Sequence, residues 1–156
     1  FTKDILIEQS DTMRIYAYEI ENYVMRINSL QDYFDASMAL LKPQVRQELF
    51  PAERPVLTRV RDQVPAKYGL GAAVNHSLVA DGCIIEGTVE NSVIFRGAKI
   101  GRGAVIRDSI IMAGAVIGDG ARLEYVVADR DATIRDTRTL VGYKTYPLFI
   151  EKKSVI

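Results

Sequence analysis

The feature that most constrains this chain is a 17-residue repeat in its C-terminal half. Ile100, Ile117 and Ile134 recur at this interval. Two further apolar columns keep the same spacing: Val89, Ile106, Leu123 and Leu140 in one, and Ile94, Ile111 and Ala128 in the other. A regular repeat of this length indicates stacked coils, and three apolar columns indicate three walls.

Each coil divides into short units. The apolar steps Ile100, Ile106, Ile111 and Ile117 make two six-residue units and one five-residue unit. Glycines recur between these units, at Gly97 and Gly114, Gly101 and Gly118, and Gly103 and Gly120. This glycine density disfavours an α-helix and suits tight corners. We therefore predict a mainly β fold, a triangular parallel β-helix of hexapeptide-like repeats with aliphatic side chains inside.

The repeat predicts the domain organisation. We expect a linker over residues 51–74, a β-helix domain over 75–142 and a C-terminal capping tail over 143–156. The first coil is irregular, because Asp81 to Ile85 matches Arg96 to Ile100 at a shorter spacing than the other coils keep, so the next corner is shortened. We expect Tyr146 to Ile150 to fold over the last coil and protect the sheet edge there.

Residues 1–50 lack the repeat. Alternating side chains over 13–18 and 23–27 predict two strands. Ser29 is expected to cap a helix, with Asp32 completing a near capping box, and a second short helix is expected over 44–50 after Pro43. Two strands and a helix are too little for an independent core, so we expect these residues to be the last elements of a larger domain whose earlier portion is absent.

Composition excludes several classes of function. Twenty basic and twenty acidic side chains cancel, so the chain has no electrostatic footprint for nucleic acid. We expect no membrane span, because no apolar run approaches the roughly 18 residues of a spanning helix. The single cysteine, Cys83, falls in a column of alanines and is predicted to be a small core residue. A cytoplasmic location fits this cysteine usage.

The strand pair, the helix begun by serine, the proline-containing linker and the hexapeptide coils together resemble the C-terminal part of ADP-glucose pyrophosphorylase, also called glucose-1-phosphate adenylyltransferase. The residues that carry the resemblance are Tyr16-Ala17-Tyr18-Glu19, Tyr23-Val24-Met25-Arg26-Ile27-Asn28-Ser29-Leu30, Tyr33-Phe34-Asp35-Ala36-Ser37-Met38-Ala39-Leu40-Leu41, Pro65-Ala66-Lys67 and Val89-Glu90-Asn91-Ser92-Val93-Ile94. The resemblance implies a left-handed β-helix, an α/β nucleotidyltransferase domain whose C-terminal tail is residues 1–50, and a role in ADP-glucose and glycogen synthesis.

One position departs from the family pattern. Where catalytic members place an Asp that helps to hold Mg²⁺ against the nucleotide phosphates, this chain has Arg26, and Asn28 replaces the following glycine. A cation does not ligate a cation, so the chain is most similar to the non-catalytic GlgD-type subunit, with Mg²⁺ held by a catalytic partner. The alternative is that Arg26 is a surface strand residue one position out of register.

The resemblance also implies partners and effector sites. We expect association with a catalytic subunit of the same enzyme, with other copies of the chain, or with both, and no catalytic or metal-binding residue in this segment. Family members bind anionic effectors such as sugar phosphates through basic residues around the β-helix. Arg130, which follows Asp129 where many members carry Asp-Lys, is the first candidate and Arg122 the second. The alternative is that both arginines are solvated residues of the coils.

Histidine content tests other enzymes with this shape. A β-helical carbonic anhydrase needs three histidines on zinc, and His76 is the single histidine here, so that hypothesis is excluded. An acyltransferase using acyl-CoA needs one histidine as a general base. His76 at the entrance to the first coil is predicted to be a solvated or capping residue, and the acyltransferase remains the alternative function.

Overall fold

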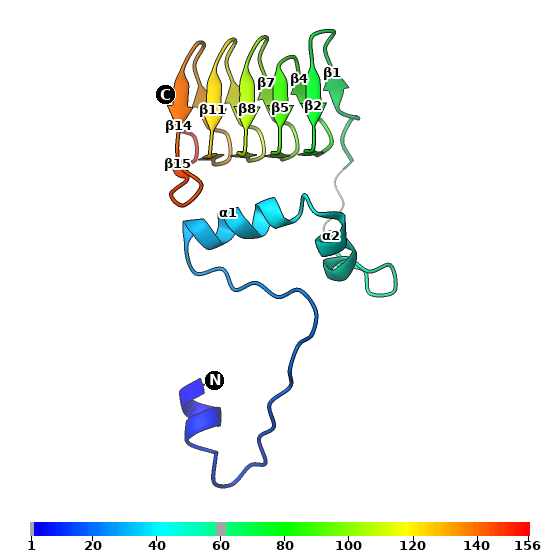
Figure 1. Ribbon diagram of the computed structural model, residues 1–156, viewed down its shortest axis with the longest axis vertical. Coiled ribbons are helices and arrows are strands. Elements are labelled where there is room, and N and C mark those ends of the chain that lie inside the picture. The colour runs from blue at the N-terminus through cyan, green and yellow to red at the C-terminus, as the bar shows by residue number, and fades with distance from the viewer. Residues whose placement is uncertain (1, 59–61) are drawn as a thin grey trace.

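The computed structural model describes residues 2–58 and 62–156. Fifteen short strands in the described residues wind around one axis and form three parallel sheets (Figure 1). Sheet A contains β1 (Lys67–Tyr68), β4 (Ile84–Ile85), β7 (Lys99–Ile100), β10 (Val116–Ile117) and β13 (Thr133–Ile134). Sheet B contains β2 (Ala73–Asn75), β5 (Thr88–Glu90), β8 (Val105–Arg107), β11 (Arg122–Glu124) and β14 (Thr139–Val141). Sheet C contains β3 (Leu78–Val79), β6 (Val93–Ile94), β9 (Ile110–Ile111), β12 (Val126–Ala128) and β15 (Leu148–Ile150). The predicted mainly β fold, a left-handed parallel β-helix of hexapeptide-like repeats, is confirmed.

The three apolar columns form the interior. Ile117 pairs with Ile100 on one side and Ile134 on the other, as the repeat predicts. All three side chains are at most 1% exposed. Burial of an isoleucine contributes roughly 1.5–3 kcal/mol, so this stack is a main source of stability. Cys83 is fully buried in the alanine column, as predicted, and its thiol donates to the carbonyl oxygen of Phe95 at 3.1 Å.

The irregular first coil has the predicted short corner. Only Glu86 and Gly87 lie between β4 and β5, whereas residues 101–104 lie between β7 and β8. A Cβ on Gly87 would collide with the carbonyl oxygens of Gly101 and Ala104 in the next coil. Glycine therefore lets the short corner pack against the longer one.

The β-helix extends beyond the predicted boundaries at both ends. β1 pairs with β4 and β2 pairs with β5, so the first coil begins at Lys67, inside the predicted 51–74 linker. Residues 59–61 of that linker lie outside the described residues. At the other end β15 pairs with β12, and Val155 bridges Thr133. The tail therefore continues the coil in place of folding over it.

The tail includes an insertion. In a regular coil the paired residues are 17 positions apart, as Ile110 and Val127 are. Val126 pairs with Leu148, which lies farther along the chain than this spacing, so the last coil is longer than the others. Residues 143–147 form the extra loop at the corner between sheets B and C, and we call them the insertion loop. Tyr143 and Tyr146 close it through two backbone hydrogen bonds of 3.0 and 2.9 Å.

The helix predicted after Ser29 is confirmed. In α1 (Leu30–Ala39), the Ser29 hydroxyl accepts the Asp32 N–H at 3.1 Å, and the Asp32 carboxylate accepts the Asn28 N–H at 3.0 Å. These bonds satisfy backbone N–H donors at the start of the helix. They also lower the pKa of Asp32, and the hydrogen bond from Asn28 has a larger effect than the one with Ser29. The second predicted helix is confirmed as α2 (Pro43–Leu49), which begins and ends one residue earlier than the expected 44–50.

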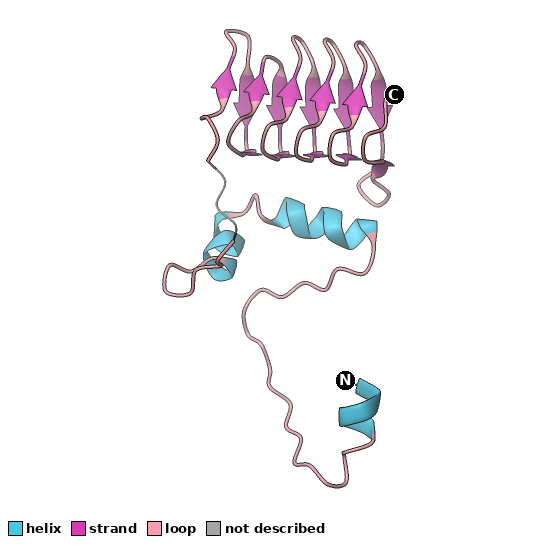
Figure 2. Cartoon of the chain, turned by 180° about the vertical axis from the view of Figure 1, so that it is seen from behind, coloured by secondary structure: helices cyan, strands magenta, loops and turns pink. Residues whose placement is uncertain are grey.

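Helix α1 runs along the coil stack on the outer face of sheet C (Figure 2). Phe34, 3% exposed, packs against Ile110 and Val127. The outward positions of this sheet form an apolar column in register: Leu78, Val93, Ile110, Val127 and Phe149. This column explains why the helix covers sheet C.

The prediction of two strands, over 13–18 and 23–27, is wrong. Residues 14–28 have no regular secondary structure, and a short π-helix, η1 (Thr2–Ile7), precedes them. This segment extends away from the β-helix (Figure 1). A strand needs a hydrogen-bonding neighbour, and none of the described strands pairs with it. No helix of the described residues is long and apolar enough to cross a membrane.

Candidate functional site

The candidate site is a groove of about 340 Å³ between α1 and one corner of the β-helix. The corner joins sheet B to sheet C, and four stacked coils contribute one residue each: His76, Asn91, Asp108 and Tyr125. We call these four residues the corner ladder. Each has a positive φ, between 42° and 51°. A single residue in this conformation makes the sharp turn, and Asn, Asp and His adopt it more readily than most other side chains.

Hydrogen bonds connect the corner ladder from coil to coil. His76 Nδ1 lies 2.8 Å from Asn91 Oδ1, and Asn91 Nδ2 donates to Asp108 Oδ1. Asp108 also acts on the next coil, because its negative charge is the main cause that raises the pKa of Tyr125. The ladder therefore presents a row of interacting polar side chains to the groove.

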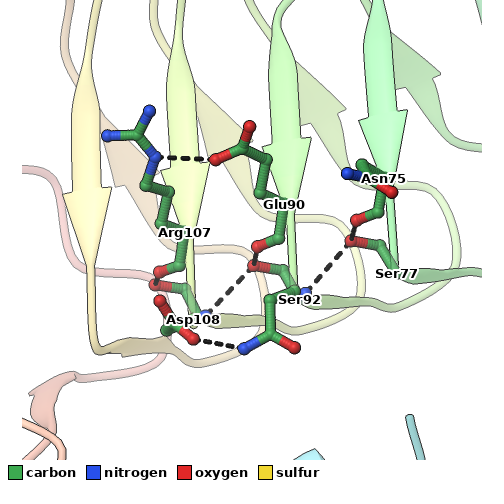
Figure 3. Close-up of polar contacts among 8 residues, drawn as sticks. Asn75, Ser77, Glu90, Ser92, Arg107 and Asp108 are labelled. Carbon is green, nitrogen blue, oxygen red and sulfur yellow. Dashed lines mark hydrogen bonds and ion pairs between the residues drawn. The ribbon is translucent and has the colours of Figure 1, made fainter.

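A second ladder, of serines, lies immediately beside the first (Figure 3). The Ser77 hydroxyl accepts the Ser92 N–H at 3.1 Å, the Ser92 hydroxyl accepts the Ser109 N–H at 3.1 Å, and the Ser109 hydroxyl accepts the Val126 N–H at 3.0 Å. Each hydroxyl also donates to a carbonyl oxygen two residues before it. Ser92 and Ser109 are fully buried, so these bonds satisfy backbone groups that water does not reach and fix the corner.

Charged side chains complete the groove. Asp35 comes from α1, Lys42 follows that helix, and Lys144 belongs to the insertion loop. Gln31 holds the loop against the helix, because its Nε2 donates to the Lys144 carbonyl oxygen at 2.9 Å and to Asp35 Oδ1 at 3.0 Å. Together with Asp108, the lining carries two basic and two acidic side chains.

The two predicted effector residues lie apart. Arg122 is the first residue of β11 and is exposed on sheet B. Arg130 lies in the corner between β12 and β13, with its Nε 3.8 Å from Asp129 Oδ1 and its side chain 61% exposed. They belong to the same coil but to different positions around it, so the structure does not bring them into one site.

Sheet B carries a further ion pair. Arg107 Nε donates to Glu90 Oε2 at 2.8 Å across neighbouring coils, and this bond raises the pKa of Arg107 (Figure 3). Both side chains are around half exposed, at 53% and 42%, so the pair adds little to stability.

The other predicted positions are exposed. Arg26 lies in the irregular segment before α1, and His76 takes part in the corner ladder. Among residues 2–58 and 62–156, no group of three or more His, Cys, Asp or Glu side chains could hold a metal ion.

Sequence reasoning missed the corner ladder, although a signal was present. The triplets Asn75-His76-Ser77, Glu90-Asn91-Ser92 and Arg107-Asp108-Ser109 each place a polar residue before a serine, and they recur once per coil. A polar column in register with the apolar columns indicates a corner with its own hydrogen-bond ladder.

Comparison with known proteins identifies relatives. The family model of the GlmU-like, C-terminal hexapeptide matches residues 63–146. The glycogen biosynthesis protein GlgD of Bacillus subtilis (strain 168) is 41% identical over 145 residues, which are 93% of this chain and 42% of that protein. GlgD of Geobacillus stearothermophilus is 52% identical over 71 residues, 46% of this chain and 21% of that protein. Glucose-1-phosphate adenylyltransferase of Geobacillus stearothermophilus is 35% identical over 108 residues, 69% and 28% of the two chains.

These findings confirm the predicted resemblance to the C-terminal part of glucose-1-phosphate adenylyltransferase, and to its GlgD type in particular. The chain spans less than half the length of each of these relatives.

Proposed function

Because the chain belongs to the GlmU-like, C-terminal hexapeptide family and resembles GlgD over most of its length, we propose that it is the regulatory and assembly portion of a glucose-1-phosphate adenylyltransferase subunit. It acts in ADP-glucose and glycogen synthesis, in the cytoplasm. Its partners are a catalytic subunit of that enzyme and further copies of the same chain. The relatives do not favour the acyltransferase alternative.

The observation that carries the assembly role is the set of exposed aromatic side chains on the C-terminal tail, residues 143–149. Tyr143, Tyr146 and Phe149 are 74%, 80% and 44% exposed. Large apolar side chains exposed close together on one short segment are typical of an interaction surface. The tail is part of the coil stack, because β15 pairs with β12, so contacts made by the tail act directly on the β-helix.

The proposal assigns Arg26 to the family position of the metal-binding Asp. At a separation of about 4 Å and an effective dielectric near 20, the repulsion energy between a guanidinium and each unit of positive charge on a metal ion is about 4 kcal/mol. The subunit therefore does not hold Mg²⁺ at this position, and the metal belongs to the catalytic partner.

The proposal also assigns the binding of an anionic sugar-phosphate effector to Arg130 and Arg122. Arg130 is the first candidate, because its guanidinium is exposed at a corner and Asp129 orients it. Arg122 is the second and would form a separate contact, since the two side chains lie in different places around the coil.

Light scattering after co-expression with the catalytic glucose-1-phosphate adenylyltransferase from the same source tests the proposal. We expect a complex, and a sugar-phosphate response of ADP-glucose formation that differs from that of the catalytic subunit alone. Tyr143→Ser combined with Tyr146→Ser should weaken the complex, whereas Leu57→Ser, at a side chain that is 91% exposed, should not. Failure to form a complex, together with an unchanged effector response, contradicts the proposal.

A further inference from the structure

The groove between α1 and the corner ladder has the chemistry of a binding site for an uncharged molecule. Its charged side chains, Asp35, Lys42, Asp108 and Lys144, sum to zero. An anion attracted by the lysines would also be repelled by the carboxylates, so a charged ligand gains little from the groove. We propose that the groove binds a neutral carbohydrate, which is a function beyond the anionic effectors and the assembly role described above.

The polar atoms of the ladder suit hydroxyl groups. Hydrogen bonds among the described residues use Nδ1 of His76 and Oδ1 of Asp108, and leave Nε2 and Oδ2 of these side chains, with the Tyr125 phenol, for a ligand. Each sugar hydroxyl is both a donor and an acceptor. A row of hydroxyls can therefore donate to the imidazole and the carboxylate and accept from the phenol and the lysines.

The other wall of the groove has an apolar part beside Asp35 and Lys42. Met38 and Leu41 line it, and the ring of Phe34 lies with its centroid 6.4 Å from that of Tyr125. Apolar and aromatic walls combined with a few convergent polar groups are typical of small-molecule sites. The C–H faces of a sugar ring match such a wall, while its hydroxyls face the ladder.

The shape of the groove indicates an elongated ligand. The ladder contributes one residue from each of four stacked coils. At roughly 4.8 Å between neighbouring strands, the polar row is about 14 Å long. This length suits a short oligosaccharide better than a single sugar ring.

The groove is also pre-organised. The serine ladder fixes the backbone of one wall, and the Gln31 contact with the insertion loop fixes the start of α1. Little ordering is then required on binding, which favours affinity.

Isothermal titration of the 156-residue chain with maltotriose tests the inference, with NMR to locate the perturbed residues. We expect saturable binding. Asp108→Asn should weaken it about tenfold or more, because a charge-assisted hydrogen bond is lost. Asn tolerates the positive φ at this position, so the fold should persist. The matched control is Asp131→Asn, an aspartate that also has a positive φ, of 59°, but lies in a corner outside the groove, and it should leave affinity unchanged. Tyr125→Phe, which retains the ring, is a second variant and should weaken binding severalfold.

Three outcomes overturn the inference. The first is no binding of maltotriose at concentrations well above the millimolar range. The second is binding that both Asp108→Asn and Tyr125→Phe leave unchanged, since the ligand would then lie elsewhere. The third is tighter binding of glucose 6-phosphate than of maltotriose, strengthened by Asp108→Asn, because removing a negative charge favours an anion. None of these measurements uses the catalytic subunit, so their failure is distinguishable from failure of the assembly role.

Discussion

Replacing Ile117 by Asp should unfold the β-helix. The side chain is 1% exposed and lies between Ile100 and Ile134 in the middle strand pairs of sheet A. The variant loses roughly 1.5–3 kcal/mol of apolar burial. It also places a carboxyl group without a partner in the interior, which costs several kcal/mol more whether the group is ionised or protonated. The sum, about 5 kcal/mol or more, equals the whole stability of many domains.

Thermal and urea unfolding followed by circular dichroism measure this effect. The matched control is Val116→Asp, because Val116 is the neighbouring residue of β10, points outward and is 36% exposed. We expect this control to change the free energy of unfolding by much less than Ile117→Asp. Equal losses in the two variants would refute the assignment of inward and outward positions and, with it, the account of the core.

Four other predictions test separate parts of the structure. Ser109→Ala should cost about 1–3 kcal/mol of unfolding free energy, because it leaves a buried backbone N–H without a partner. The control Ser10→Ala, at an exposed serine, should have almost no effect. Equal denaturation midpoints of the two variants would contradict a structural role for the serine ladder. Asp32→Asn should destabilise α1 at neutral pH, since the pKa of Asp32 is lowered in the folded chain. The stability that the Asp32 carboxylate contributes is present above the unfolded pKa of about 4 and is lost as pH falls through the folded pKa. Thermal melts of wild type and variant should therefore converge in acid. Arg26→Asp, in a longer protein that carries the nucleotidyltransferase domain, should restore some Mg²⁺-dependent ADP-glucose formation, and full activity without the change would show that Arg26 is not at the metal position. The chain should show no acyl-CoA turnover in a thiol-release assay, and turnover abolished by His76→Ala would favour the acyltransferase.

The interior was predictable because the sequence directly shows the regular spacing of the interior side chains. A side chain on a parallel coil packs against its equivalent one repeat away, so Ile100, Ile117 and Ile134 reveal both the fold and the register. The short corner was predictable for the same reason, as a local change of spacing around Gly87. The start of the first coil was not, because proline and glycine over residues 51–74 predict a linker whether or not strands lie among them.

The candidate site was harder to predict. The corner ladder depends on positive φ angles at His76, Asn91 and Asp108, and polar residues of this kind equally predict plain solvated turns. The groove also needs α1, and the position of that helix follows from outward-facing apolar residues such as Ile110, which the repeat alone does not separate from inward-facing ones. Alternation over 13–18 suggested a strand, but a strand also depends on a neighbour that local pattern does not supply.

The hydrogen bond between Gln31 and the Lys144 carbonyl has a consequence for the order of folding. Each coil pairs with the one that immediately follows it in the chain, so the coils can add one after another with little loss of chain entropy. The Gln31 contact joins positions with a sequence separation of 113 and needs the last full coil and its insertion loop already in place. Docking of α1 is therefore expected to be a late step. Amide exchange in α1 should be faster than in the central coils, and protection of the helix should report that the coil stack is complete to its C-terminal end.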